Sequence, residues 1–187
     1  MLWMVHEVHR HLPPVDYGLW ALLSLPGTLY LLLDFGGFLG LTRLIGKARG
    51  LGQPEAAGPM VATLLAFYAG LVGVVGAVAA AAANLAVVPV SGTWIALALA
   101  GYAVGLAGVP VQALLAGHER VDLQNLQVAL GTVVTALLVA AAAPHGIGPL
   151  LAAQAAGSGL MLIGLVATAA KVAGWPALAL PGWVRAR

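Results

Sequence analysis

Two long uncharged stretches limit what this chain can fold into. No Asp, Glu, Lys or Arg occurs in residues 56–118, a stretch of 63 residues, or in residues 123–170, a stretch of 48. A membrane-spanning helix needs about 20 residues, so each stretch can hold two spans and a turn. Only 7% of the residues are charged, against roughly 25% in soluble domains. The sequence therefore excludes a water-soluble enzyme, a nucleic-acid-binding domain and a disordered chain.

Proline and glycine clusters divide each stretch into two helices. One cluster lies at residues 88–92 and the other at residues 144–149, and such clusters are typical of turns. A fifth, less regular span precedes them. The chain is therefore predicted to be all-α, a polytopic membrane helix bundle of about five transmembrane helices over residues 17–172. The expected spans are residues 17–44, 60–87, 92–117, 122–143 and 148–172.

The basic residues gather on one side of this predicted bundle. Seven of the eight Lys and Arg residues lie near residues 43–49, 120 and 171–187. The positive-inside rule makes that side cytoplasmic. The expectation is a multi-pass inner-membrane protein with its N-terminal segment, residues 1–16, outside. Residues 173–187, which contain Trp175 and Trp183, are expected to form a cytoplasmic interfacial tail.

Several short segments, in order along the chain, resemble one family. They are YGLWALL at residues 17–23, LDFG at 33–36, LTRL at 41–44, KARGLGQ at 47–53, LLAGHERVDLQN at 114–125 and GIG at 146–148. The chain resembles the polysaccharide and O-antigen flippases of the multidrug/oligosaccharidyl-lipid/polysaccharide exporter superfamily over about residues 10–175. The resemblance implies helices two to six, part of the N-terminal lobe, of a longer two-lobed transporter.

The resemblance implies translocation of lipid-linked oligosaccharide or polysaccharide precursors, which needs no enzyme chemistry and no cofactor. It also implies a second lobe, or a second copy of the chain, as a partner. The chain is expected to be a gene fragment, a split half or part of a homodimer, in contact with membrane lipid and with no nucleic acid. Two alternatives stay open: a small accessory or structural membrane subunit, and a cation-coupled drug exporter of the same superfamily.

Four polar residues inside the spans are candidates for a substrate cavity: Asp34, Tyr30, Gln154 and Gln112. Asp34 is the only formal charge away from the ends of a span. A carboxylate in hydrocarbon costs a few kcal/mol, so it should face water or the bundle interior. It either binds a cation, proton or sugar hydroxyl, or pairs with a neighbouring helix. Glutamine and tyrosine side chains suit sugar binding, and equally suit hydrogen bonds between helices.

Two further groups have a functional and a structural interpretation. Arg43, Lys47 and Arg49 either attract the phosphates of a lipid carrier or hold the topology against anionic headgroups. Pro26 and Gly27, in the middle of the first span, either allow a gating bend or form a fixed kink. The histidines offer no convergent ligand set, so no metal site is expected.

Overall fold

The computed structural model describes residues 2–33, 36–53, 56–84 and 90–173, with the backbone alone for Leu2 and for residues 26–33. All elements of this part of the chain are helices. In chain order they are α1 (Leu2–His11), α2 (Pro14–Leu33), α3 (Gly37–Gly50), α4 (Ala57–Asn84), α5 (Gly92–Gly117), α6 (Val121–Ala142), the short 3-10 helix η2 (Ala143–His145) and α7 (Ile147–Ala173). The all-α helix bundle expected from the sequence is confirmed.

Four of these helices are long and apolar enough to cross a membrane, namely α4, α5, α6 with η2, and α7. They correspond to four of the five expected spans, although the end of the span at 60–87 lies outside the described residues. In hydrocarbon a helix satisfies its backbone hydrogen bonds internally, which explains why uncharged stretches of this length form continuous helices. The chain is therefore a multi-pass membrane protein.

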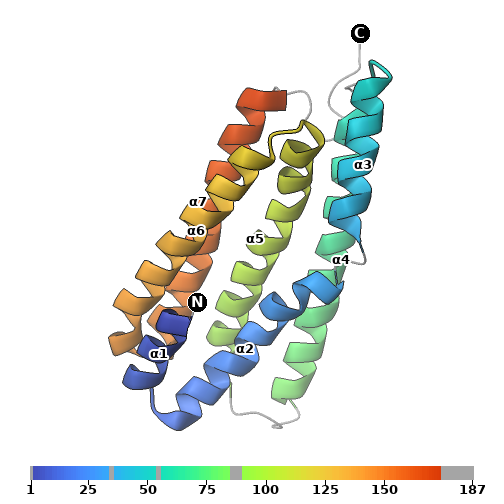
Figure 1. Ribbon diagram of the computed structural model, residues 1–187. Helices are drawn as coiled ribbons and strands as arrows, with labels where there is room; N and C mark the ends of the chain where they lie inside the picture. The colour runs from blue at the N-terminus through green and yellow to red at the C-terminus, as the bar shows by residue number, and fades with distance from the viewer. Residues whose placement is uncertain (1, 34–35, 54–55, 85–89, 174–187) are drawn as a thin grey trace.

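Helix α5 lies at the centre of the bundle (Figure 1). It packs against α7 and α6 on one side and against α3 and α4 on the other, while α2 crosses its lower part obliquely. Small residues in α5 allow close approach; a methyl group added at Gly101, for example, would lie 3.4 Å from Ala155 Cα of α7. The buried side chains of α5, including Leu106, Leu114 and Leu115, thus join both halves of the bundle.

The first expected span, residues 17–44, was wrong as a single helix. Helix α2 ends at Leu33 and α3 begins at Gly37. Gly36 precedes α3 with φ 77°, in the left-handed region that an L side chain rarely adopts and glycine tolerates. The chain therefore changes direction between α2 and α3 (Figure 1), and the break lies after Leu33 and not at Pro26, through which α2 continues.

The N-terminal segment is also helical and packs against the rest of the bundle. Val8 and Leu12 are buried together with Trp20 of α2, Val139 of α6 and Ile147 of α7. This cluster fixes α1 and the start of α2 against one end of α6 and α7 (Figure 1). It positions the inner face of α2 opposite α7, where the candidate site lies. Of the predicted tail, residues 173–187, all but the first residue lie outside the described part of the chain.

Candidate functional site: a polar cavity between α2, α5 and α7

A cavity of about 480 Å³ opens between α1, α2, α5, α6 and α7. Its lining side chains that carry polar groups come from four of these helices. They are Trp20, Ser24, Tyr102, Gln112, Thr132, Gln154 and Ser158. Among the described lining residues none bears a formal charge, so the cavity suits a ligand recognised by neutral hydrogen-bonding groups.

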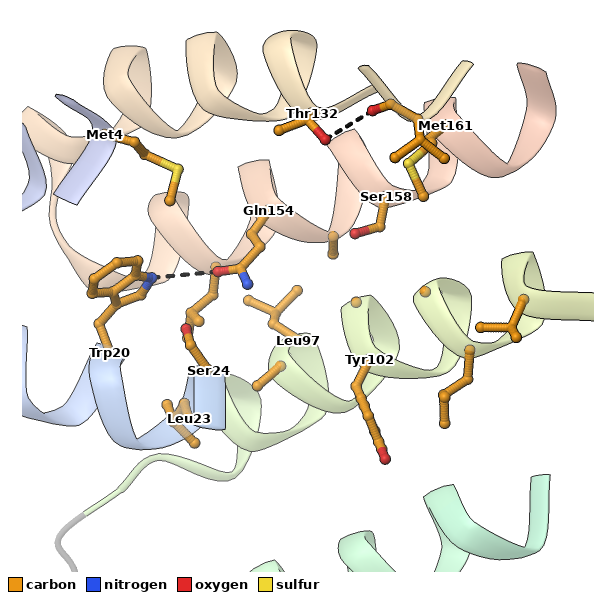
Figure 2. A pocket seen from close by; sticks show the side chains of 18 of the residues that line it. Met4, Trp20, Leu23, Ser24, Leu97, Tyr102, Thr132, Gln154, Ser158 and Met161 are labelled. Carbon is orange, nitrogen blue, oxygen red and sulfur yellow. Dashed lines mark hydrogen bonds between the residues drawn. The ribbon is translucent and has the colours of Figure 1, made fainter. Parts of the chain in front are cut away.

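A hydrogen bond across this cavity joins α2 to α7. The indole N–H of Trp20 donates a hydrogen bond of 3.3 Å to Oε1 of Gln154. Figure 2 shows the two side chains pointing toward each other, with Ser24 on the α2 side of the cavity and Ser158 on the α7 side. Because this bond uses one acceptor of the Gln154 amide, its NH₂ group remains a donor for a ligand.

The helical repeat explains why these polar side chains lie on one face. Trp20 and Ser24 are four residues apart in α2, and Gln154 and Ser158 are four residues apart in α7. Residues with this spacing are neighbours on a helix surface. The packing of α2 and α7 against α5 then turns both faces toward the same space.

Thr132 of α6 supplies a hydroxyl whose hydrogen is already engaged. Its Oγ1 donates to the Val128 backbone oxygen over 2.8 Å, as Figure 2 shows. This bond is typical of threonine within apolar helices. The oxygen of Thr132 can still accept a hydrogen bond, so the α6 wall presents an acceptor, and the α7 wall presents the Gln154 amide.

Of the four predicted cavity candidates, Gln154 and Gln112 line this cavity. Tyr30 lies on the α2 backbone, and its side chain lies outside the described part, as does Asp34. Pro26 and Gly27 belong to α2, and the side-chain position of Pro26 is likewise outside it. The roles predicted for these residues stay predictions.

The three predicted basic residues all lie on α3 but differ in their surroundings. All three are exposed, and Nη1 of Arg49 donates a hydrogen bond of 3.0 Å to the Gly117 backbone oxygen at the end of α5. A cation at a helix C-terminus satisfies an unpaired carbonyl and interacts favourably with the helix dipole. Arg49 therefore joins α3 to α5.

A charged pair follows the end of α5. Nε and Nη2 of Arg120 each donate to one carboxylate oxygen of Asp122 over 3.2 Å. These hydrogen bonds, together with the negative charge, raise the pKa of Arg120 above its usual value. The pair is exposed, so solvent screening keeps its contribution to stability small. It lies away from the polar cavity and marks the turn between α5 and α6.

Reasoning from the sequence missed Trp20, Ser24, Thr132 and Ser158 as cavity residues. Ser24, Thr132 and Ser158 are isolated hydroxyl residues within apolar helices. This signal is ambiguous, because such a hydroxyl can form its hydrogen bond with a backbone carbonyl of its own helix. The usable signal was the spacing of four from Trp20 to Ser24 and from Gln154 to Ser158. Assigning both pairs to one cavity required knowing how α2 packs against α7.

Comparison of the chain with protein-family models, with curated proteins and with solved structures gives no match.

Proposed function

We propose that this protein binds lipid-linked oligosaccharide or polysaccharide precursors and takes part in moving them across the membrane. The observation that carries the proposal is the uncharged cavity of about 480 Å³, lined by amide, hydroxyl and indole groups, within a bundle of membrane helices. Its volume lies in the range of about 300–1,000 Å³ typical of small-molecule sites. The resemblance of its loop segments to polysaccharide flippases supports the same function.

The chemistry of the lining groups favours sugars over ions. A sugar hydroxyl both donates and accepts hydrogen bonds, and glutamine amides and serine hydroxyls do the same. An ion entering from water would need a compensating charge in a medium of low dielectric constant. The described lining residues provide none, so the sugar part of such a precursor, and not its phosphate, fits this cavity best.

Translocation requires a hydrated path for the headgroup while the lipid chain stays in hydrocarbon. Polar side chains from α2, α5, α6 and α7 would form one wall of such a path. Alternating access would come from movement of this bundle against a second lobe or a second copy. No bond is made or broken in this process.

Transport can be measured in proteoliposomes that contain a fluorescent lipid-linked oligosaccharide. We expect the purified protein to accelerate equilibration of this lipid between the two leaflets. Chemical reduction of the dye in the outer leaflet measures the rate. Gln154→Leu removes both hydrogen-bonding functions of the amide and should slow equilibration by on the order of tenfold. Gln124→Leu is the matched control, because Gln124 does not line the cavity.

Equilibration at the protein-free rate, with the protein folded, would contradict transport by this chain. That result would favour the accessory-subunit alternative. If Gln154→Leu and Gln124→Leu slowed equilibration equally, the cavity would have no specific role in transport.

A further inference from the structure

Helix α3 has one face inside the bundle and one face outside it. Leu41 is buried in a cluster with residues of α4, α5 and α7. On the outer face Leu39 and Leu44 are 58% and 49% exposed, and Arg43 and Lys47 are exposed beside them. Leucine and basic side chains on one exposed helix face are typical of a helix that contacts both the hydrocarbon and the headgroups of a bilayer.

Arg43 and Lys47 form a pair of neighbouring positive charges on this face. They are four residues apart in the helix, a spacing that brings two side chains together on a helix surface. Neither is in an ion pair with any acidic residue that the structure describes. Gly46 and Gly50 leave open space beside the pair, because a Cβ added at either would meet nothing of a neighbouring element within 4 Å. Two adjacent cations with room around them suit an anionic group such as a phosphate.

The contacts of α3 with α5 show how deep each part of this face lies. Phe38, near the start of α3, packs against a buried cluster that includes Leu106 in the middle of α5. Arg49, near the end of α3, bonds to Gly117 at the end of α5. Since α5 is long and apolar enough to cross the membrane, α3 runs from the interior of the membrane toward one surface (Figure 1). Leu39 therefore lies deeper than the basic pair, as the acyl chains of a phospholipid lie deeper than its phosphate.

The basic pair is separate from the polar cavity. The described residues that line that cavity come from α1, α2, α5, α6 and α7, and none of them comes from α3. Arg49 is not part of the pair, because its guanidinium is engaged with Gly117 of α5. A phosphate held by Arg43 and Lys47 would therefore lie at the outside of the bundle, among the lipids that surround it. This position fits a lipid of the bilayer better than a substrate in a transport path.

We propose that the outer face of α3 binds an anionic membrane phospholipid. Arg43 and Lys47 contact its phosphate, and one acyl chain lies along Leu39 and Leu44. The occupant is a resident lipid that stays in its own leaflet and is not transported. The inference is independent of the proposed function, because it uses neither the polar cavity nor a sugar.

The proposal can be tested with the whole chain in phosphatidylcholine nanodiscs and two photoreactive probes. One probe is a phosphatidylglycerol with a diazirine in one acyl chain, and the other is a phosphatidylcholine with the same diazirine. We expect the phosphatidylglycerol probe to crosslink more strongly than the phosphatidylcholine probe to the α3 peptide that contains Leu39 and Leu44. Equal crosslinking of α3 by the two probes would overturn the proposal.

Competitors identify the source of the bound phosphate. Unlabelled phosphatidylglycerol in the bilayer should reduce the α3 crosslinks, whereas glycerol phosphate in solution should not. Displacement by glycerol phosphate would show a site for a soluble anion. Displacement by polyprenyl phosphate at a lower membrane fraction than phosphatidylglycerol needs would show a site for a lipid carrier. Either displacement would overturn the assignment to a resident phospholipid.

Charge-removing variants test the basic pair. A cation near the membrane surface contributes about fivefold to the binding of anionic lipid, so Arg43→Gln together with Lys47→Gln should lower the preference for phosphatidylglycerol at least about tenfold. Both side chains are exposed, so the packing of α3 stays intact. The matched control is Arg10→Gln together with Lys171→Gln, which removes the same charge from two other exposed positions and should leave the preference unchanged. Equal losses in the two double variants would reveal a general effect of net charge and would overturn the site.

Discussion

The Arg49 guanidinium donates a hydrogen bond of 3.0 Å from Nη1 to the backbone oxygen of Gly117, 68 residues away in the chain. The same glycine lies against α3, where an added Cβ would approach Ile45 Cγ2 to 2.7 Å and the Thr42 oxygen to 3.2 Å. Glycine at this position lets the two helix ends come close enough for the bond. Arg49 thereby connects the broken α2–α3 segment to the central helix.

Replacing Arg49 with methionine keeps the apolar stem and removes the donor. We expect Arg49→Met to lower the free energy of unfolding by about 1 kcal/mol, less than for a fully buried charged hydrogen bond because the residue is exposed. Reversible unfolding in mixed micelles measures the change. Arg43→Met, on the same helix and exposed, is the control, and an equal loss in both variants would mean that the bond to Gly117 contributes nothing.

The contact between α6 and α7 depends on glycine at position 157. A methyl group added there would lie 2.8 Å from Thr135 Cα, a backbone atom that can move only if the helices separate. We expect Gly157→Ala to lower stability by about 1–3 kcal/mol. Gly159→Ala, two residues along, has open space around it and should be neutral or slightly stabilising in the same unfolding assay. Similar losses in the two variants would contradict the close contact.

The bond between Trp20 and Gln154 can be measured by a double-mutant cycle. Trp20→Phe removes the donor and Gln154→Leu removes the acceptor, so the double variant should lose less stability than the two single changes added together. The expected coupling is about 0.6 kcal/mol, the average for hydrogen bonds between membrane helices. A coupling of zero would indicate that the cavity holds the two side chains apart in the membrane.

The orientation in the membrane can be determined by labelling, because the chain contains no cysteine. Single cysteines placed by Lys47→Cys and Lys171→Cys should react with a membrane-impermeant maleimide only from the cytoplasmic side, since basic loops stay inside. Asp16→Cys and His145→Cys should react only from the opposite side. Labelling of all four positions from one side would contradict the bundle topology, and the reverse pattern would contradict the orientation.

The membrane class and four of the helices were predictable from the sequence because they depend on local properties. An uncharged stretch such as residues 92–117 satisfies its backbone groups within the segment itself when it forms a helix in hydrocarbon. The break before α3 was less accessible. Gly36 and Gly37 are also typical of helix packing in membranes, and only the backbone conformation at Gly36 shows that one of them turns the chain.

The candidate site followed from the sequence only in part. Gln154 and Gln112 stand out as amides within apolar spans, and both line the polar cavity. Their neighbours depend on tertiary structure, since Trp20 reaches Gln154 across 134 residues of chain. Arg49 likewise bonds to Gly117, 68 residues away. The long uncharged stretches determined that helices form in a membrane. The tertiary structure alone decided which faces meet, because that choice depends on side-chain contacts between segments far apart in the chain.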